Sequence, residues 1–163
     1  HPVIISPERK IELNDHLMLF FTGFSRFSSD IQKGTEKSMK DKTSQLIEMY
    51  HLVDEAEKIL TDKNISLNDF GKLLDYTWKL KRGISAGIST GSIDEQYAKA
   101  MNAGALGGKL LGAGGGGFLL FYVPLEKQAD VKNALKDQMC VPFKFENDGT
   151  KIIYYSAEDY KEE

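Results

Sequence analysis

The residues with the clearest chemical potential in this chain are a run of glycines. Gly112 and Gly114 to Gly117 lie in the segment LLGAGGGGF, between apolar runs at 106–111 and 118–123. Glycine-rich loops can bind phosphate, because their backbone N–H groups reach an anion without obstruction from side chains. Phosphate binding is therefore the first chemistry to test against the sequence.

Two nucleotide-binding motifs are excluded by the residues on the C-terminal side of the glycines. Gly112, Gly114 and Gly117 match the G-x-G-x-x-G spacing of a dinucleotide loop, but such a loop leads into a helix, and residues 118–123 are typical of a strand. A Walker loop needs Lys and then Ser or Thr after its last glycine, where this chain has Phe118. The glycines therefore have another purpose.

The number of glycines favours a close approach by another group. A flexible tether is disfavoured, because apolar strands are predicted on both sides. Four consecutive glycines, Gly114 to Gly117, also exceed what a hairpin turn requires. We predict that a backbone or a ligand lies where a Cβ would collide with it, and a plain turn is the alternative.

A second candidate site lies after the strand predicted at residues 16–22. Thr22, Gly23 and Arg26 lie at or just after the end of this strand, where a rigid element can support binding groups. The planar guanidinium of Arg26 suits bidentate binding of a phosphate, which makes it the preferred contact for a phosphorylated substrate. A solvated surface arginine is the alternative.

A third group of polar residues lies where a predicted helix runs into the loop at 83–91. Lys81, Arg82 and Ser85 lie there. Basic residues at a helix C-terminus are favourably placed in the helix dipole, and a serine in a loop is explained by ordinary turn chemistry. Lys109 comes just before the glycines. Its side chain either points toward a cleft at the glycine run or takes the solvent face of its strand.

The remaining polar residues predict no catalytic or metal site. Asp15, Asp75, Asp94 and Glu95 form no compelling carboxylate pair, so no catalytic residue is assigned. The three histidines and the single cysteine, Cys140, lack the spacing of a zinc site.

Composition narrows the class of protein. A chain of 163 residues is predicted to form one domain, and a net charge of −3 gives little electrostatic support for binding nucleic acid. No apolar run approaches the roughly 20 residues of a membrane span. A single cysteine excludes an internal disulfide and fits a cytoplasmic protein. A first residue that is not Met, with no leader before it, suggests a fragment or a processed product.

Hydrophobic periodicity predicts five helices and several strands. The helices are expected at about 28–39, 46–60, 66–82, 92–103 and 126–139. An apolar stripe on the second of them is predicted to be core, and consists of Leu46, Met49, Tyr50, Val53, Ala56 and Leu60. The third and fourth are predicted to begin at capping boxes, Ser66 with Asp69 and Ser92 with Glu95. In the fifth, Val131, Leu135 and Met139 share a face.

The predicted strands are separated by helices without regular alternation. They are expected at 3–6, 16–22, 106–111 and 118–123, with a hairpin formed by 143–145 and 152–155. This order favours an α+β fold, with an antiparallel sheet backed by helices.

Three stretches resemble the GHMP kinases. They are DHLMLFFTGFSRFSSDI at 15–31, WKLKRGISAGIS at 78–89, and DEQYAKAMNAGALGGKLLGAGGGGFLLFYVP at 94–124. The last is similar to the third motif of that family, and together they are most similar to its heptose 7-phosphate kinases and related sugar kinases. The resemblance covers nearly the whole chain.

The resemblance implies a fold for the chain and roles for the candidate residues, with Lys81, Arg82 and Ser85 as candidate contacts to the sugar substrate. It implies that 1–163 is a ferredoxin-like C-terminal domain, with 1–14 either the end of an N-terminal half or the connection to it. That half would bind most of the ATP and Mg²⁺, since its phosphate loop has no counterpart here. The glycine-rich active-site loop would comprise Lys109, Gly112, Ala113, Gly114, Gly115, Gly116 and Gly117.

The resemblance also implies partners and leaves alternatives open. The partners would be the N-terminal half and a sugar phosphate, with no nucleic acid and no membrane, and a homodimer stays open. The chain alone would be inactive. A fucokinase-like half and a stand-alone ferredoxin-like module that binds a metabolite without catalysis are the alternatives.

Overall fold

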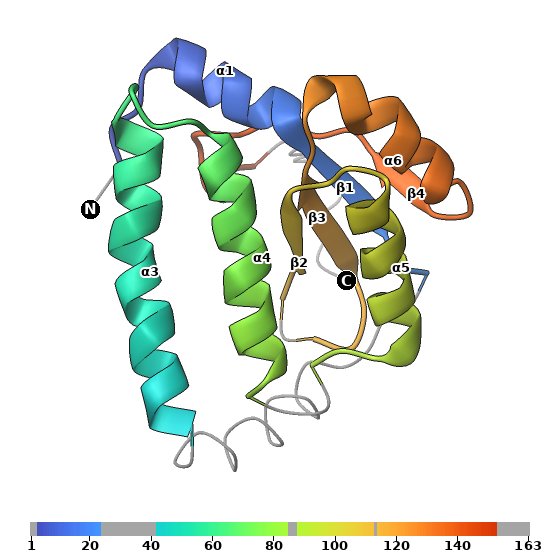
Figure 1. The fold of residues 1–163 in the computed structure, drawn as a ribbon. Helices are drawn as coiled ribbons and strands as arrows, with labels where there is room; N and C mark the ends of the chain where they lie inside the picture. Colours follow the sequence, from blue (N-terminus) through green and yellow to red (C-terminus); the bar gives the residue numbers. More distant parts are fainter. Residues whose placement is uncertain (1–2, 24–41, 85–87, 113, 153–163) are drawn as a thin grey trace, which may run out of the picture.

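The computed structural model describes residues 3–23, 42–84, 88–112 and 114–152 (Figure 1). Its helices are α1 (Pro7–His16), α3 (Thr43–Thr61), α4 (Asn68–Arg82), α5 (Gly91–Asn102) and α6 (Gln128–Ala134), and a short 3-10 turn, η2 (Leu125–Lys127), precedes the last. The strands are β1 (Leu17–Phe21), β2 (Gly107–Leu110), β3 (Phe118–Tyr122) and β4 (Met139–Val141).

The four strands form one antiparallel sheet in the order β2-β3-β1-β4. In β1 and β3, Leu17 lies opposite Tyr122 and Phe21 opposite Phe118. Read from the other edge, β4-β1-β3-β2 is the strand order of a ferredoxin-like sheet. The predicted α+β fold with an antiparallel sheet and additional helices is therefore confirmed.

The main core lies between one face of the sheet and the helices α5 and α6. Phe20 of β1, Phe121 of β3, Ile93 of α5 and Val131 of α6 are fully buried in it, together with Trp78 of α4. A second cluster joins α1, α3 and α4 around Tyr122. In Figure 1, α3 and α4 lie side by side beyond the edge strand β2.

One end of the sheet, which we call the packed end, is where β1 begins and β3 ends. Here α4 lies directly on β2, because Gly71 and Gly107 have no side chains. A Cβ on Gly107 would lie 1.9 Å from the carbonyl oxygen of Gly71, and one on Gly71 would lie 2.7 Å from the ring of Tyr122. Glycine at these two positions therefore sets the distance between helix and sheet.

A buried cation ties α1 to the C-terminal end of α3 at the packed end. The guanidinium of Arg9 donates to the carbonyl oxygens of Leu60 at 2.9 Å and Ile65 at 2.7 Å, and also to that of Ile59. The last carbonyls of a helix have no partner within it, so Arg9 satisfies groups that would otherwise be buried unpaired.

Two predictions near the chain ends are wrong. Residues 3–6 form no strand, because Ser6 caps α1 by accepting from the N–H of Arg9 and Pro7 takes the first helical turn, where its fixed φ is favourable. Met139 does not share a helical face with Val131 and Leu135. It lies in β4, opposite Phe21, and is 68% exposed.

The capping residue of α5 and part of the α3 core were also mispredicted. The N-cap of α5 is Thr90, not Ser92, and its hydroxyl accepts from the N–H of Ile93. On α3, Tyr50 is 71% and Val53 61% exposed, so the apolar stripe is only partly core.

The predicted hairpin and first helix have different outcomes. Residues 143–145 are not in a strand, and neither is residue 152. The helix predicted at 28–39 and residues 153–155 lie outside the described residues.

Candidate functional site

The glycine run forms the turn between β2 and β3, as predicted. We call residues 111–117 the glycine turn, and the end of the sheet that carries it the turn end. The same end holds the last residue of β1, the C-terminus of α4 and the N-terminus of α5 (Figure 1). Every predicted site residue that the structure describes, from the three separate sequence stretches, lies at this end.

Backbone conformation accounts for most of the glycines in the turn. The dihedral φ is positive at Gly112, Gly114, Gly115 and Gly117, a region that other residues enter only with strain. Among the described residues, a Cβ on Gly112 would meet no atom within 4 Å, so these residues leave the space beside it open. The turn is therefore shaped for glycine, and one side of it faces a free volume.

Thr22, at the end of β1, holds the turn in place. Its N–H and its hydroxyl both donate to the carbonyl oxygen of Gly117, at 2.9 and 3.0 Å. The side-chain amide of Gln96 donates to the carbonyl oxygen of Thr22 at 3.2 Å, and Thr22 is only 2% exposed. The structure thus gives Thr22 a positioning role, and a direct contact with substrate stays a prediction.

Two further contacts brace the turn from the helices. The N–H of Gly115 donates to the carbonyl oxygen of Ile88 at 3.0 Å, just before α5. The ammonium group of Lys81, in the last turn of α4, donates to the carbonyl oxygen of Gly112 at 2.8 Å. Burial, and then the positive charge of Lys109, lower the pKa of Lys81.

Arg82 is engaged within the chain. Its guanidinium forms an ion pair of 2.6 Å with Asp94, and the hydroxyl of Ser89 donates to the same carboxylate oxygen at 2.8 Å. The guanidinium also lies 5.9 Å from the ring centroid of Trp78. These contacts join the end of α4 to the start of α5, and any substrate contact by Arg82 stays a prediction.

Of the other predicted site residues, the structure describes Gly23 and Lys109. Gly23 is exposed, has a positive φ of 83°, and would have no atom within 4 Å of a Cβ. Lys109 is partly buried on β2, opposite Leu120. Arg26, Ser85 and Ala113 lie outside the described residues.

Sequence reasoning missed Gln96 and the role of Asp94. Gln96 is buried beside Ile93, Tyr97 and Ala100 on the inner face of α5. A polar side chain on an otherwise apolar helical face is a usable signal, because it must find a partner when it is buried. Asp94 gave no such signal, since its partners Arg82 and Ser89 are on other segments.

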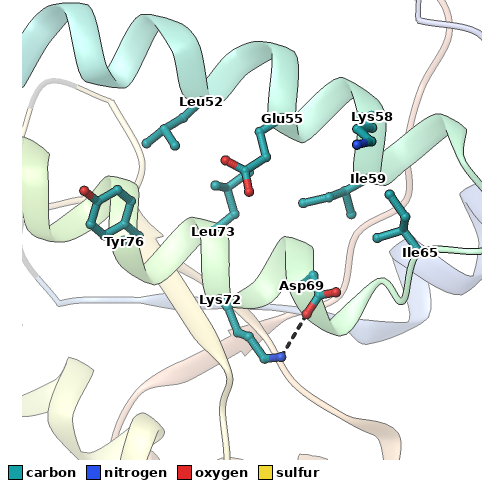
Figure 2. Close-up of a pocket in the computed structure, with 9 residues that line it drawn as sticks. All are labelled: Leu52, Glu55, Lys58, Ile59, Ile65, Asp69, Lys72, Leu73 and Tyr76. Carbon is teal, nitrogen blue, oxygen red and sulfur yellow. Dashed lines mark hydrogen bonds and ion pairs between the residues drawn. The ribbon is translucent and has the colours of Figure 1, made fainter.

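A groove lies away from the glycine turn. Its volume is about 490 Å³ and it runs between α3 and α4 (Figure 2). Its polar groups include Lys72 and Asp69, which pair with each other at 2.8 Å. It contains none of the predicted site residues, so it carries no part of the proposed chemistry.

The described ranges contain neither a candidate metal site nor a candidate membrane helix. Those ranges contain no group of three or more His, Cys, Asp or Glu residues that could hold a metal ion. Within the same ranges, no helix is both long and apolar enough to cross a membrane.

Comparison with known proteins agrees with the fold. Residues 54–140 match the family described as GHMP kinases C terminal. The chain is 32% identical over 159 residues to D-glycero-alpha-D-manno-heptose 7-phosphate kinase of Campylobacter jejuni, covering 91% of this chain and 46% of the relative. It is 25% identical over 141 residues to the bifunctional fucokinase/GDP-fucose pyrophosphorylase of Arabidopsis thaliana, covering 83% and 13% respectively. The solved mevalonate kinase of Methanococcus jannaschii superposes with a TM-score of 0.67 at 26% identity, covering 84% and 42%.

These matches define the class of protein. A ferredoxin-like sheet that the family model matches over more than half of the chain is the C-terminal domain of this family. The chain belongs to the GHMP kinase family. It spans less than half the length of the heptose kinase that it resembles.

Proposed function

We propose that this chain is the C-terminal half of an ATP-dependent sugar kinase that phosphorylates the anomeric hydroxyl of D-glycero-D-manno-heptose 7-phosphate. The similarity to the Campylobacter jejuni heptose kinase supports this substrate over the others in the family. The proposed protein is cytoplasmic. The observation that carries the proposal is the glycine turn, which is hydrogen-bonded to Thr22, Ile88 and Lys81 and is open beside Gly112 among the described residues.

The chemistry of phosphoryl transfer explains why such a turn is useful. The reaction needs the acceptor hydroxyl and the γ-phosphate to be held in line, with water excluded, more than it needs covalent help from the protein. A turn without side chains lets the phosphate-binding backbone of an N-terminal half come into contact distance. Its free amide groups then add hydrogen bonds to anionic oxygens.

The candidate residues take separate roles in this proposal. Arg26 binds the phosphate of the substrate, and the loop that contains Ser85 faces the sugar. Thr22 and Lys81 position the glycine turn. ATP and Mg²⁺ are held mainly by the N-terminal half, so this chain alone releases no ADP, and residues 1–14 include the connection to that half.

A second candidate function is a fucokinase-like activity. The match to the fucokinase of Arabidopsis thaliana favours it, since the alignment covers 83% of this chain. The two candidates differ in whether the substrate carries a phosphate at its far end. That difference gives the experiment its design.

The test compares two proteins and a panel of acceptors. The 163-residue chain and the polypeptide that includes the N-terminal half are each incubated with ATP, Mg²⁺ and heptose 7-phosphate, fucose or mevalonate, and ADP release is measured. We expect turnover only for the longer protein with heptose 7-phosphate, and a raised KM for that sugar in Arg26→Ala. Turnover with another acceptor would contradict heptose 7-phosphate as the substrate. Turnover by the 163-residue chain would contradict the proposal that the N-terminal half is needed to bind ATP.

A further inference from the structure

A second cavity lies beside the glycine turn, between α3, α4 and β2. Its volume is about 250 Å³. Its walls are mostly apolar, and include Met49, Val53 and Ala56 of α3 with Phe70, Leu74 and Trp78 of α4. Lys81 and Lys109 also line it. A cavity of this kind combines an apolar body with a positively charged rim.

Neither lysine has a carboxylate partner among the residues that the structure describes. In the ranges that the structure describes, neither ammonium forms an ion pair with a carboxylate, and the partner of Lys81 is a neutral carbonyl oxygen. Two like charges near each other in a partly buried site disfavour one another. Burial and the charge of Lys109 accordingly lower the pKa of Lys81. An anion between the two ammonium groups would reverse this unfavourable interaction.

Lys81, which lines the cavity, has unused hydrogen-bond donors. An ammonium group has three N–H donors, and Lys81 gives one of them to Gly112. The indole N–H of Trp78 is buried and has no hydrogen-bond partner among the described residues, although Trp78 is only 1% exposed.

We propose that Lys81 and Lys109 bind the anionic head of an amphipathic ligand, a phosphate or carboxylate attached to an apolar body that lies in the cavity between α3 and α4. The apolar walls separate this ligand from a sugar phosphate, whose hydroxyl groups would be buried there without partners. The site is therefore distinct from the substrate site proposed above. Since Lys81 also holds Gly112, a bound anion shares a lysine with the glycine turn.

The single tryptophan of the chain gives a direct test, because Trp78 lines the cavity. Tryptophan fluorescence is followed while the 163-residue chain is titrated with decyl phosphate or decanoate below the micelle concentration. Inorganic phosphate and decanol are the controls for the head and the tail. We expect saturable binding of at least one alkyl anion, and binding of both controls weaker by about tenfold or more.

Two variants and a matched control sharpen the test. Lys109→Met should weaken binding of the alkyl anion by about tenfold or more. Lys72→Met, on the exposed side of α4, should leave it unchanged. Val53→Asp, at a position 61% exposed, tests the tail without disturbing the core and should also weaken binding. Equal binding of decanol, unchanged binding in Lys109→Met and Val53→Asp, or no saturable signal up to about 1 mM would each overturn the proposal.

Discussion

At the packed end of the sheet, a Cβ on Gly107 would lie 1.9 Å from a backbone carbonyl oxygen, whereas at the turn end a Cβ on Gly112 would meet no atom of the described residues within 4 Å. The first glycine is required because another element occupies the space. The second is required by its φ of 80°, and the space beside it is open. The same residue type thus closes one end of the domain and leaves the other accessible.

The cations at the two ends differ in the same way. Arg9, at the packed end, is buried and donates to three backbone carbonyl oxygens. At the turn end, Lys81 donates to one carbonyl oxygen, that of Gly112, and the ammonium group of Lys109 has no hydrogen bond among the described residues. A structural cation is satisfied within its own chain, and an unsatisfied one is available to a ligand. We therefore expect changes at the packed end to affect stability most, and changes at the turn end to affect function most.

The largest effect on stability is expected for Gly107→Ala. The new methyl group would overlap the backbone of α4, so that helix and sheet must separate, at about 3 kcal/mol or more in the free energy of unfolding. Urea denaturation measures this loss. Gly91→Ala is the matched control, since a Cβ there meets no atom within 4 Å. Equal stability of the two variants would show that α4 does not pack on β2 as described.

Arg9→Met is expected to come next, at about 2 to 3 kcal/mol, because the C-terminal carbonyls of α3 lose charged hydrogen-bond donors. The measurement is again the free energy of unfolding from urea denaturation. Lys10→Met removes the same charge one residue later, where the ammonium donates to the exposed side chain of Asn147, and should have little effect. A loss in Lys10→Met as large as that in Arg9→Met would contradict the role of Arg9.

Thr22→Val is expected to lower stability by about 1 kcal/mol, because Gly117 loses one of its two hydrogen bonds from Thr22. The shape of the side chain is preserved, which isolates the hydroxyl. Thr61→Val, where the hydroxyl makes an exposed bond within α3, is the control and should change the thermal midpoint less. If the control is the more destabilised variant, Thr22 does not hold the glycine turn.

The smallest expected effect is a difference in pH dependence. The pKa of Lys81 is lowered from 10.5, so between the lowered value and 10.5 the unfolded chain binds more protons than the folded one. Stability therefore rises with pH in that window. The free energy of unfolding, measured from pH 8 to about pH 10.5, should rise more for the unaltered chain than for Lys81→Met. Parallel curves would mean that Lys81 is not desolvated.

The elements at the turn end were predictable from the sequence because local patterns encode them. Compact apolar runs predicted β1, β2 and β3, and the run of glycines between the last two predicted their turn. The same local signals misled at residues 3–6, where an apolar run before a proline belongs to the approach to a capped helix. They also misled at α5, because Thr90 and Ser92 are both good caps and only the fold selects between them.

The contacts that hold the site could not be predicted from periodicity. Thr22 and Gly117 are 95 residues apart, and Lys81 and Gly112 are 31 residues apart. Such long-range hydrogen bonds end on backbone carbonyl oxygens. Because every residue has one, the residue types do not indicate which carbonyl is used. For the same reason the sequence pointed to Thr22, Lys81 and Arg82 as substrate contacts, without indicating that the domain itself uses all three.

The central claim is that the open side of the glycine turn serves catalysis. It is tested most directly by the turnover of Gly112→Ala in the protein that includes the N-terminal half, with Gly91→Ala as the control. We predict that the rate of ADP formation with heptose 7-phosphate falls by about tenfold or more in Gly112→Ala, at a temperature where the variant stays folded, and is unchanged in the control. A folded Gly112→Ala protein with full turnover would contradict the account.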